Sequence, residues 1–322
     1  MGPHPEEKIQ LSASITPELA GRRLDQAAAA LFDGYSRARL QAWIKSGALT
    51  VDGRTARPRD RVEGNEQLLL LAEPEQEVFS RPQALDLDLV HCDEHILVLN
   101  KPAGLVVHPA AGHADGTLLN GLLALDERQA GLPRAGIVHR LDRDTTGLMV
   151  VARSLQAHSG LVEQLQDKSL YREYRAVVAG VMTGGGKVEA PVGRHPVDRK
   201  RMAVTERGKP AVTHYRLLER FRGHSYLRVQ LETGRTHQIR VHMAHLRYPL
   251  VGDRVYGGRP RFPAGAGEAL RETLRTFRRQ ALHAAVLGLV HPVSGEELRF
   301  EVPLPADMES LLECLRQDRE VS

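Results

Sequence analysis

The chain carries a succession of short apolar runs, and helical patterns do not separate each run from the next. Examples are "HILVLN" at 95–100, "LMVVA" at 148–152 and "YREYRAVVAG" at 171–180. Runs of this length predict β-strands. A wholly parallel sheet would need a crossover, usually a helix, between successive strands, and no such regular alternation is present. We therefore expect an α+β domain with a mixed, mostly antiparallel central sheet.

A few helices are predicted between these strands. Residues 116–125 and 155–165 have helical spacing, and a helix beginning near His237 places Ile239, Met243 and Leu246 on one face. A turn at Lys101-Pro102 should join two strands, and two strands should close the domain. The chain shows no Walker-type or dinucleotide-binding glycine loop.

Length and cysteine content limit the class of protein. A chain of 322 residues with 42% hydrophobic side chains can form one large core and a small satellite domain. Two cysteines, Cys92 and Cys314, provide no disulfide framework, so a reducing, cytoplasmic setting is expected. No leader-like apolar region or membrane-spanning run is evident. We expect a soluble monomer with no membrane partner.

Positive charge is concentrated near the N-terminus, although the net charge is only +4. A patch of this kind predicts contact with a polyanion, and a merely soluble surface explains the charge equally well. Within residues 21–61, four acidic residues (Asp25, Asp33, Asp52 and Asp60) oppose nine basic ones. The basic residues are Arg22, Arg23, Arg37, Arg39, Lys45, Arg54, Arg57, Arg59 and Arg61.

The same region has an ordered helical pattern. A helix at 24–32, a turn at Asp33-Gly34, a second helix capped by Ser36 and a hairpin around Asp52-Gly53 are predicted. This order resembles the S4 RNA-binding domain. The predicted organisation is a flexible N-terminus (1–20), an S4-like αα-β domain (21–72), a linker (73–84), a catalytic domain (85–310) and a tail (311–322).

The stretch "HRLDRDTTG" at 139–147 is the strongest candidate for chemistry. Asp142 lies between Arg140 and Arg143, and positive neighbours favour an ionised carboxylate. Thr145, Thr146 and Gly147 should form a polar turn before the buried strand, which would anchor the loop. Taken alone, a charged turn of this kind is more often structural.

Four ordered motifs identify a resemblance. "HRLDRDTTGL" at 139–148 resembles the signature of the RluA-type pseudouridine synthases. These enzymes break the N1–C1′ bond of a uridine in RNA and rejoin C5 to C1′, so the resemblance implies that fold, that activity, no cofactor and no metal. The other matching stretches, in the family's order, are "NKPAGLVVHP" (100–109), "GRTHQIRVHMAHLRYPLVGDRVYGG" (234–258), and the pair "LHA" (282–284) and "HPVSG" (291–295).

The resemblance implies roles by position. Asp142 stands where the family has its catalytic aspartate, Tyr174 where it has an active-site tyrosine, and Arg240 where it pairs an arginine with the aspartate. Tyr171 and Arg235 are the local competitors. Strand alternation allows only one of the two tyrosines to face a pocket.

Further residues are expected to contact RNA. Arg140 matches a family arginine that enters the RNA beside a flipped uridine. A basic loop at 194–210 contributes Arg199, Lys200 and Arg201. Residues 258–280 fit either a solvated insertion or an RNA contact.

The substrate depends wholly on the resemblance. The most similar members imply large-subunit (23S) ribosomal RNA, or the large subunit itself, at several uridines of the helix 69 stem-loop. Another ribosomal site, or tRNA, is the first alternative, and a non-catalytic ribosome-assembly factor is the second. A zinc site at His237, His242 and His245 is a third reading, which no nearby cysteine or HExxH pattern supports.

Overall fold

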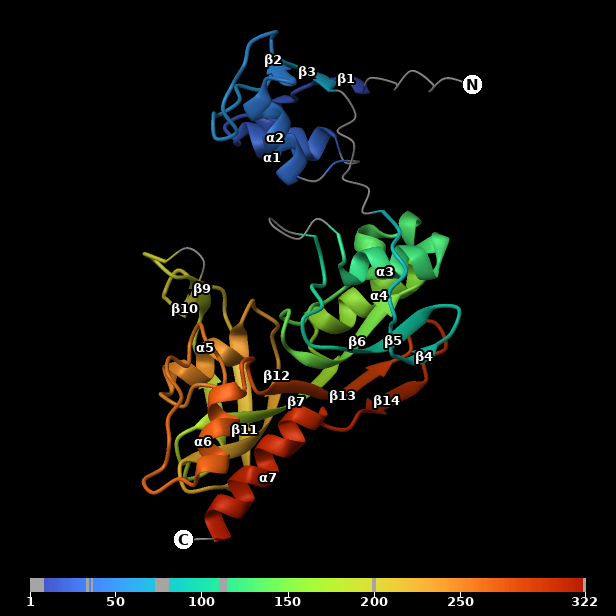
Figure 1. Ribbon diagram of the computed structural model, residues 1–322. Helices are drawn as coiled ribbons and strands as arrows, with labels where there is room; N and C mark the ends of the chain where they lie inside the picture. Colours follow the sequence, from blue (N-terminus) through green and yellow to red (C-terminus); the bar gives the residue numbers. More distant parts are fainter. Residues whose placement is uncertain are drawn as a thin grey trace. The chain divides into compact units, whose positions relative to one another are not determined.

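The computed structural model describes residues 9–32, 35, 37–72, 81–109, 115–198 and 201–320. The chain divides into two compact units, 1–79 and 80–322, which are described separately (Figure 1). Within the described ranges, no helix has the length and apolar character needed to cross a membrane.

The small unit packs two helices on a three-stranded sheet. Helices α1 (Leu24–Leu31) and α2 (Arg37–Ser46) follow a short 3-10 turn, η1 (Pro17–Leu19). Leu24, Leu40 and Trp43 are buried in the core that the helices form with the sheet. The antiparallel sheet has the order β1-β3-β2, with β1 (Ile9–Ser14), β2 (Leu49–Val51) and β3 (Gln67–Ala72).

One expectation for this unit was wrong. Residues 9–14 were assigned to a flexible terminus, but they form β1, paired along its length with β3. The partner strand lies more than fifty residues away, so no local signal indicates this pairing. The predicted hairpin turn at Asp52-Gly53 is present, closed by an antiparallel bridge between Val51 and Arg54, while β2 itself pairs with β3. The predicted turn at Asp33-Gly34 and cap at Ser36 lie outside the described residues.

The large unit is built on one mixed sheet, which confirms the expected α+β class. Its strand order is β4-β5-β6-β13-β7-β12-β11-β8, with β14 paired to β13. Only the contact between β6 and β13 is parallel among these pairings. The strands are β4 (Leu89–Cys92), β5 (Ile96–Lys101), β6 (Thr146–Ala152), β7 (Tyr171–Ala179), β8 (Gly186–Glu189), β11 (Val212–Arg220), β12 (His224–Leu231), β13 (Leu282–Val290) and β14 (Glu297–Glu301).

Helices cover both faces of this sheet (Figure 1). Alternation along β7 sends Ala176 and Val178 to one face and Val177 to the other. The first face packs against α3 (Leu118–Leu125) and α5 (Gln238–His245). The second packs against α4 (Leu155–Gln166), α6 (Glu268–Thr276) and α7 (Ala306–Glu320). Shorter elements are η2 (Glu127–Gly131), η3 (Pro133–Gly136) and the hairpin of β9 (Val192–Arg194) with β10 (Met202–Val204).

Three boundaries of the large unit differ from expectation. Residues 311–322 were predicted to be a tail, but Leu311, Leu312 and Leu315 of α7 are buried in the core. Residues 102–109 form turns and loop rather than a second strand. The linker was expected to reach residue 84, yet Arg81 and Gln83 already hydrogen-bond to Asn120 of α3. Most of that linker, 73–80, lies outside the described residues.

Candidate active site

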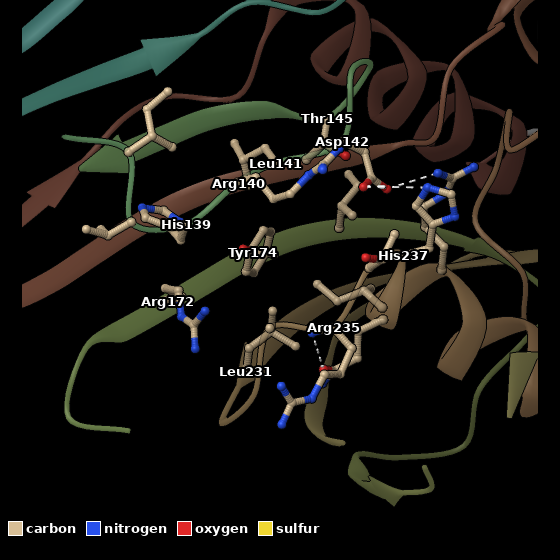
Figure 2. A pocket seen from close by; sticks show the side chains of 18 of the residues that line it. His139, Arg140, Leu141, Asp142, Thr145, Arg172, Tyr174, Leu231, Arg235 and His237 are labelled. Carbon is tan, nitrogen blue, oxygen red and sulfur yellow. Dashed lines mark hydrogen bonds and ion pairs between the residues drawn. The ribbon is translucent and has the colours of Figure 1, made fainter. Parts of the chain in front are cut away.

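A pocket of about 690 Å³ opens on the face of the large sheet that carries α3 and α5. Its wall combines the 139–145 loop, Tyr174 on β7, and residues 234–240 at the start of α5 (Figure 2). These three segments correspond to three of the stretches that the sequence singled out. The fold therefore brings together residues that are about a hundred positions apart in the chain.

The loop that carries Asp142 is held firmly at the start of β6. The Thr145 amide donates to the Asp142 carbonyl oxygen at 3.0 Å, and Gln280 donates to the Thr145 hydroxyl at 3.0 Å. Gly147 follows with φ +110°, and a Cβ there would lie 2.2 Å from the carbonyl oxygen of Ala284. Only glycine fits at that position, because β13 passes too close for any side chain. The predicted polar turn and buried anchor strand are confirmed.

Lys101 also stabilises this loop through hydrogen bonds. Its side chain is fully buried, and Nζ donates to the carbonyl oxygens of Pro102, Leu105 and Arg143 at 2.7, 3.0 and 2.7 Å. Burial lowers the pKa of Lys101 to about 8, against the attraction of Asp144 and Asp142. Nothing in the sequence indicates this role for Lys101, although it lies in "NKPAG". A lone lysine at a strand end gives no sign that it will be buried.

Arg240 joins Asp142 to a second carboxylate. Its Nη1 donates to Oδ2 of Asp142 at 2.9 Å, while Nε and Nη2 donate to Asp253 at 2.6 and 3.0 Å. Burial opposes the charge on Arg240, but hydrogen bonds and charge from Asp253, with charge from Asp142, raise its pKa. The Arg240 guanidinium also lies 5.0 Å from the centre of the Tyr256 ring. The arginine is thereby fixed in one orientation.

Of the arginines expected to act on Asp142, the distant Arg240 contacts it, whereas the sequence neighbours of Asp142 do not. Arg143 forms its ion pair with Asp144 at 3.1 Å, and Arg140 is an exposed residue at the pocket wall. Arg235 also lines the pocket, but its Nε donates to the Pro210 carbonyl oxygen. Arg240, distant in sequence, provides the cation that contacts Asp142.

Tyr174 and Tyr171 face opposite sides of β7, as strand alternation predicts. Tyr174 is 5% exposed and lines the pocket, and its hydroxyl has no hydrogen-bond partner among the described residues. Burial raises the pKa of Tyr174. Tyr171 instead donates to Glu173, and Arg299 lies over its ring. Tyr174 is therefore the tyrosine that can meet a ligand in this pocket (Figure 2).

Arg172, which no sequence signal marks, forms a polar wall of the pocket together with the half-buried His139. Arg172 is 6% exposed, and it forms no ion pair with a carboxylate in the described part of the chain. Burial lowers its pKa. His139 accepts a hydrogen bond from the Val150 amide at 3.1 Å, and burial, with the charge of Arg172, lowers its pKa to about 3. A buried guanidinium without an anion is costly, so Arg172 has the capacity to pair with an anion in the pocket.

His237 and His242, at the start of and within α5, contact different residues and do not form a common site. His237 lies at φ +56°, contacts the Tyr256 hydroxyl at 2.8 Å, and places Nε2 3.8 Å from Oδ1 of Asp142. His242 contacts Thr213 and the Ala190 carbonyl oxygen instead. Across the described ranges, no three histidine, cysteine or acidic side chains are grouped as metal ligands would be. His237 belongs to the pocket wall, and burial lowers its pKa.

The basic residues predicted in the small unit have varied surroundings. Arg23 and Arg37 both bind the buried carboxylate of Asp25, at 2.8 and 2.9 Å. Arg39 lies 5.0 Å from the centre of the Trp43 ring. Three others, Arg22, Lys45 and Arg54, are exposed. In the large unit, Arg201 lies over Tyr256, while Arg199 and Lys200 fall outside the described residues.

Comparison with known proteins identifies the family of this chain. Residues 95–245 match the RNA pseudouridylate synthase family model, and residues 22–68 match the S4 domain. Ribosomal large subunit pseudouridine synthase D of Pseudomonas aeruginosa is 60% identical over 314 residues, covering 98% of each chain. The chain belongs to the RNA pseudouridylate synthase family. The same-named protein of Escherichia coli K12 is 54% identical over 315 residues, covering 98% of this chain and 97% of that one.

A solved structure supports the family's fold. Human RNA pseudouridylate synthase domain containing 4 aligns with a TM-score of 0.56 at 27% identity, over 71% of this chain and 93% of that one. The catalytic-domain fold and the S4 domain expected from sequence are both confirmed. The chain is thus an RNA pseudouridine synthase with an S4 RNA-binding domain.

Proposed function

We propose that this synthase isomerises uridines of large-subunit ribosomal RNA, with Asp142 as the catalytic carboxylate. One observation supports the assignment of Asp142 as the catalytic carboxylate. Arg240 holds Oδ2, while Oδ1 has no hydrogen bond among the described residues, and the side chain lines the pocket. A carboxylate oriented through one oxygen and open at the other suits attack on a bound nucleotide.

The reaction requires no change of oxidation state. The N1–C1′ bond breaks, the uracil turns, C5 bonds to C1′, and the proton on C5 is lost while N1 gains one. The open oxygen of Asp142 would add to C1′ or C6, or remove a proton from C2′ so that uracil leaves as an anion. Arg240 would keep the carboxylate ionised and fixed in each of these routes.

Neighbouring side chains fit a flipped nucleotide. The Tyr174 ring offers a surface for stacking on uracil, and its unpartnered hydroxyl can exchange a proton or hydrogen bond with the base. Arg172 would receive its missing anion from a phosphate of the RNA. Arg140, exposed at the rim, would occupy the space beside the extruded base.

Similarity along nearly the whole chain supports the ribosomal substrate. The two bacterial relatives, at 54% and 60% identity, are both described as large-subunit synthases. Both align with the small unit, which contains the S4 domain, as well as with the large unit. We propose the helix 69 stem-loop of 23S ribosomal RNA, at several uridines, as the target. The S4 unit would bind that RNA through its exposed basic residues.

Mapping pseudouridines in ribosomal RNA, from cells with and without this gene, tests the substrate. We expect the helix 69 pseudouridines to disappear in the deletion and to return with the wild-type gene. If the pseudouridines return with the wild-type gene but not with Asp142→Asn, their formation requires the Asp142 carboxylate and not only the presence of the protein during ribosome assembly. Pseudouridine loss confined to another ribosomal site, or to tRNA, would overturn the helix 69 assignment.

A further inference from the structure

A second cavity, of about 470 Å³, lies in the large unit beyond Asp253. It is bounded by the end of β7 at Ala179, the start of β12 at His224, the 249–261 segment, and the end of α6. Asp253 belongs to its wall, while the carboxylate of the same residue binds Arg240 of the main pocket. One residue therefore links the two cavities.

The lining of this second cavity is strongly basic. Asp253 is its only carboxylate among the described residues, and Arg240 already neutralises it. Arg275 alone of the cavity's arginines faces carboxylates, at Glu268 and Glu272, and the others form no ion pair within the described ranges. The five arginines that line the cavity are Arg254, Arg259, Arg261, Arg275 and Arg278.

His224 is a buried polar residue of the same wall. It is 1% exposed, and its Nδ1 is buried without a hydrogen-bond partner. Gly258, with φ +70° and open space where a Cβ would stand, leaves the adjoining wall as bare backbone.

We propose that this second cavity binds backbone phosphates of the RNA substrate, outside the target nucleotide. Guanidinium groups match phosphate oxygens in geometry and charge, and clustered arginines without carboxylates repel one another until an anion arrives. Asp253 lines this cavity, and its carboxylate holds Arg240 of the main pocket, so the two sites share one ion pair. RNA as the source of the phosphates rests on the proposed function.

The test uses the full chain with both Arg259→Gln and Arg261→Gln, which removes two exposed charges. The matched control carries Arg216→Gln and Arg247→Gln, two exposed arginines of the same unit that line neither described cavity. The Kd for a helix 69 stem-loop transcript is measured from low to high salt. Two lost phosphate contacts should weaken binding about tenfold or more and reduce the slope of log K against log salt by about 1.5–2. Equal losses in the two double variants would overturn the proposal.

A chemical readout separates this site from the substrate assignment. Wild-type protein is treated with an arginine-specific dicarbonyl reagent, with and without the transcript, and the modified positions are identified by mass spectrometry. RNA should protect Arg259, Arg261 and Arg278 but not Arg216 or Arg247. Protection by inorganic phosphate and not by RNA would overturn the proposal in favour of a small phosphorylated ligand. If RNA protects these arginines but the protein never isomerises that RNA, the phosphate site is supported and the proposed function is contradicted.

Discussion

The two units use arginine and aspartate in opposite proportions. In the catalytic pocket, one arginine, Arg240, serves two carboxylates, Asp142 and Asp253. In the S4 unit, one buried carboxylate, Asp25, collects two arginines, Arg23 and Arg37. The first arrangement leaves a carboxylate oxygen of Asp142 open to a ligand, and the second leaves positive charge at the surface.

This contrast suggests that the pocket arginine serves the reaction, whereas the S4 arginines serve RNA affinity. The side chain of Arg240 is 8% exposed, whereas those of Arg23 and Arg37 are 38% and 45% exposed. A buried arginine shared by two carboxylates fixes their geometry and is costly to lose, while the partly exposed Arg23 and Arg37 share one buried carboxylate and add to the surface potential. We therefore expect changes in the pocket to affect rate and stability, and changes on the S4 surface to affect RNA affinity.

Replacing Arg240 should give the largest loss of stability. Arg240→Met leaves Asp253, which is fully buried at its side chain, without a counter-charge. The free energy of unfolding, measured by denaturant titration, should fall by roughly 3–5 kcal/mol, and pseudouridine formation should be lost. The comparison variant is Arg23→Gln, which leaves Asp25 its contacts with Arg37 and Gln41 and should cost less than about 1 kcal/mol. Similar losses for the two variants would remove the distinction between the units.

Replacing Tyr174 should affect rate without affecting stability. Tyr174→Phe keeps the stacking ring and removes a hydroxyl that has no partner in the described chain. The single-turnover rate should fall by roughly 10²-fold, while the melting temperature and RNA affinity stay near wild type. Tyr171→Phe, on the opposite face of β7, is the matched control and should keep its rate. A full rate in Tyr174→Phe would exclude proton handling by this hydroxyl.

Neutralising the S4 surface should give the mildest change. Arg22, Lys45 and Arg54 are exposed, and replacing all three with glutamine should weaken RNA binding about tenfold and reduce its salt dependence. Filter binding over a salt series measures both quantities. The single-turnover rate at high RNA concentration should change far less than the affinity. Unchanged affinity would show that these residues do not bind RNA.

The sequence predicted the elements that have a strong local signal. Buried strands such as 148–152 and the helix at 155–165 appear where apolar periodicity indicated them. The strand Ile9–Ser14 and the helix Ala306–Glu320 were missed, because each is stabilised by partners far along the chain. Asp142, Tyr174 and Arg240 were ranked by family resemblance, and the fold places all three on one pocket.

The supporting residues of the site were not predictable in the same way. Asp253, Lys101 and Arg172 are single charged residues in otherwise ordinary stretches, and their importance arises from burial. Arg143 was expected to act on Asp142, but it binds Asp144 instead. Charge order along a loop does not determine which side chains meet, because the direction of each side chain depends on the fold.

The most direct test is the rate and affinity of Asp142→Asn, measured on the same helix 69 transcript. The substitution keeps the shape of the side chain and removes the carboxylate that Arg240 orients. Single-turnover pseudouridine formation should fall by at least about 10³-fold, because no other carboxylate with an open oxygen is grouped with Tyr174 in the described pocket. The RNA Kd should remain within about twofold of wild type. Pseudouridine formation close to the wild-type rate would contradict the central claim, whatever the affinity.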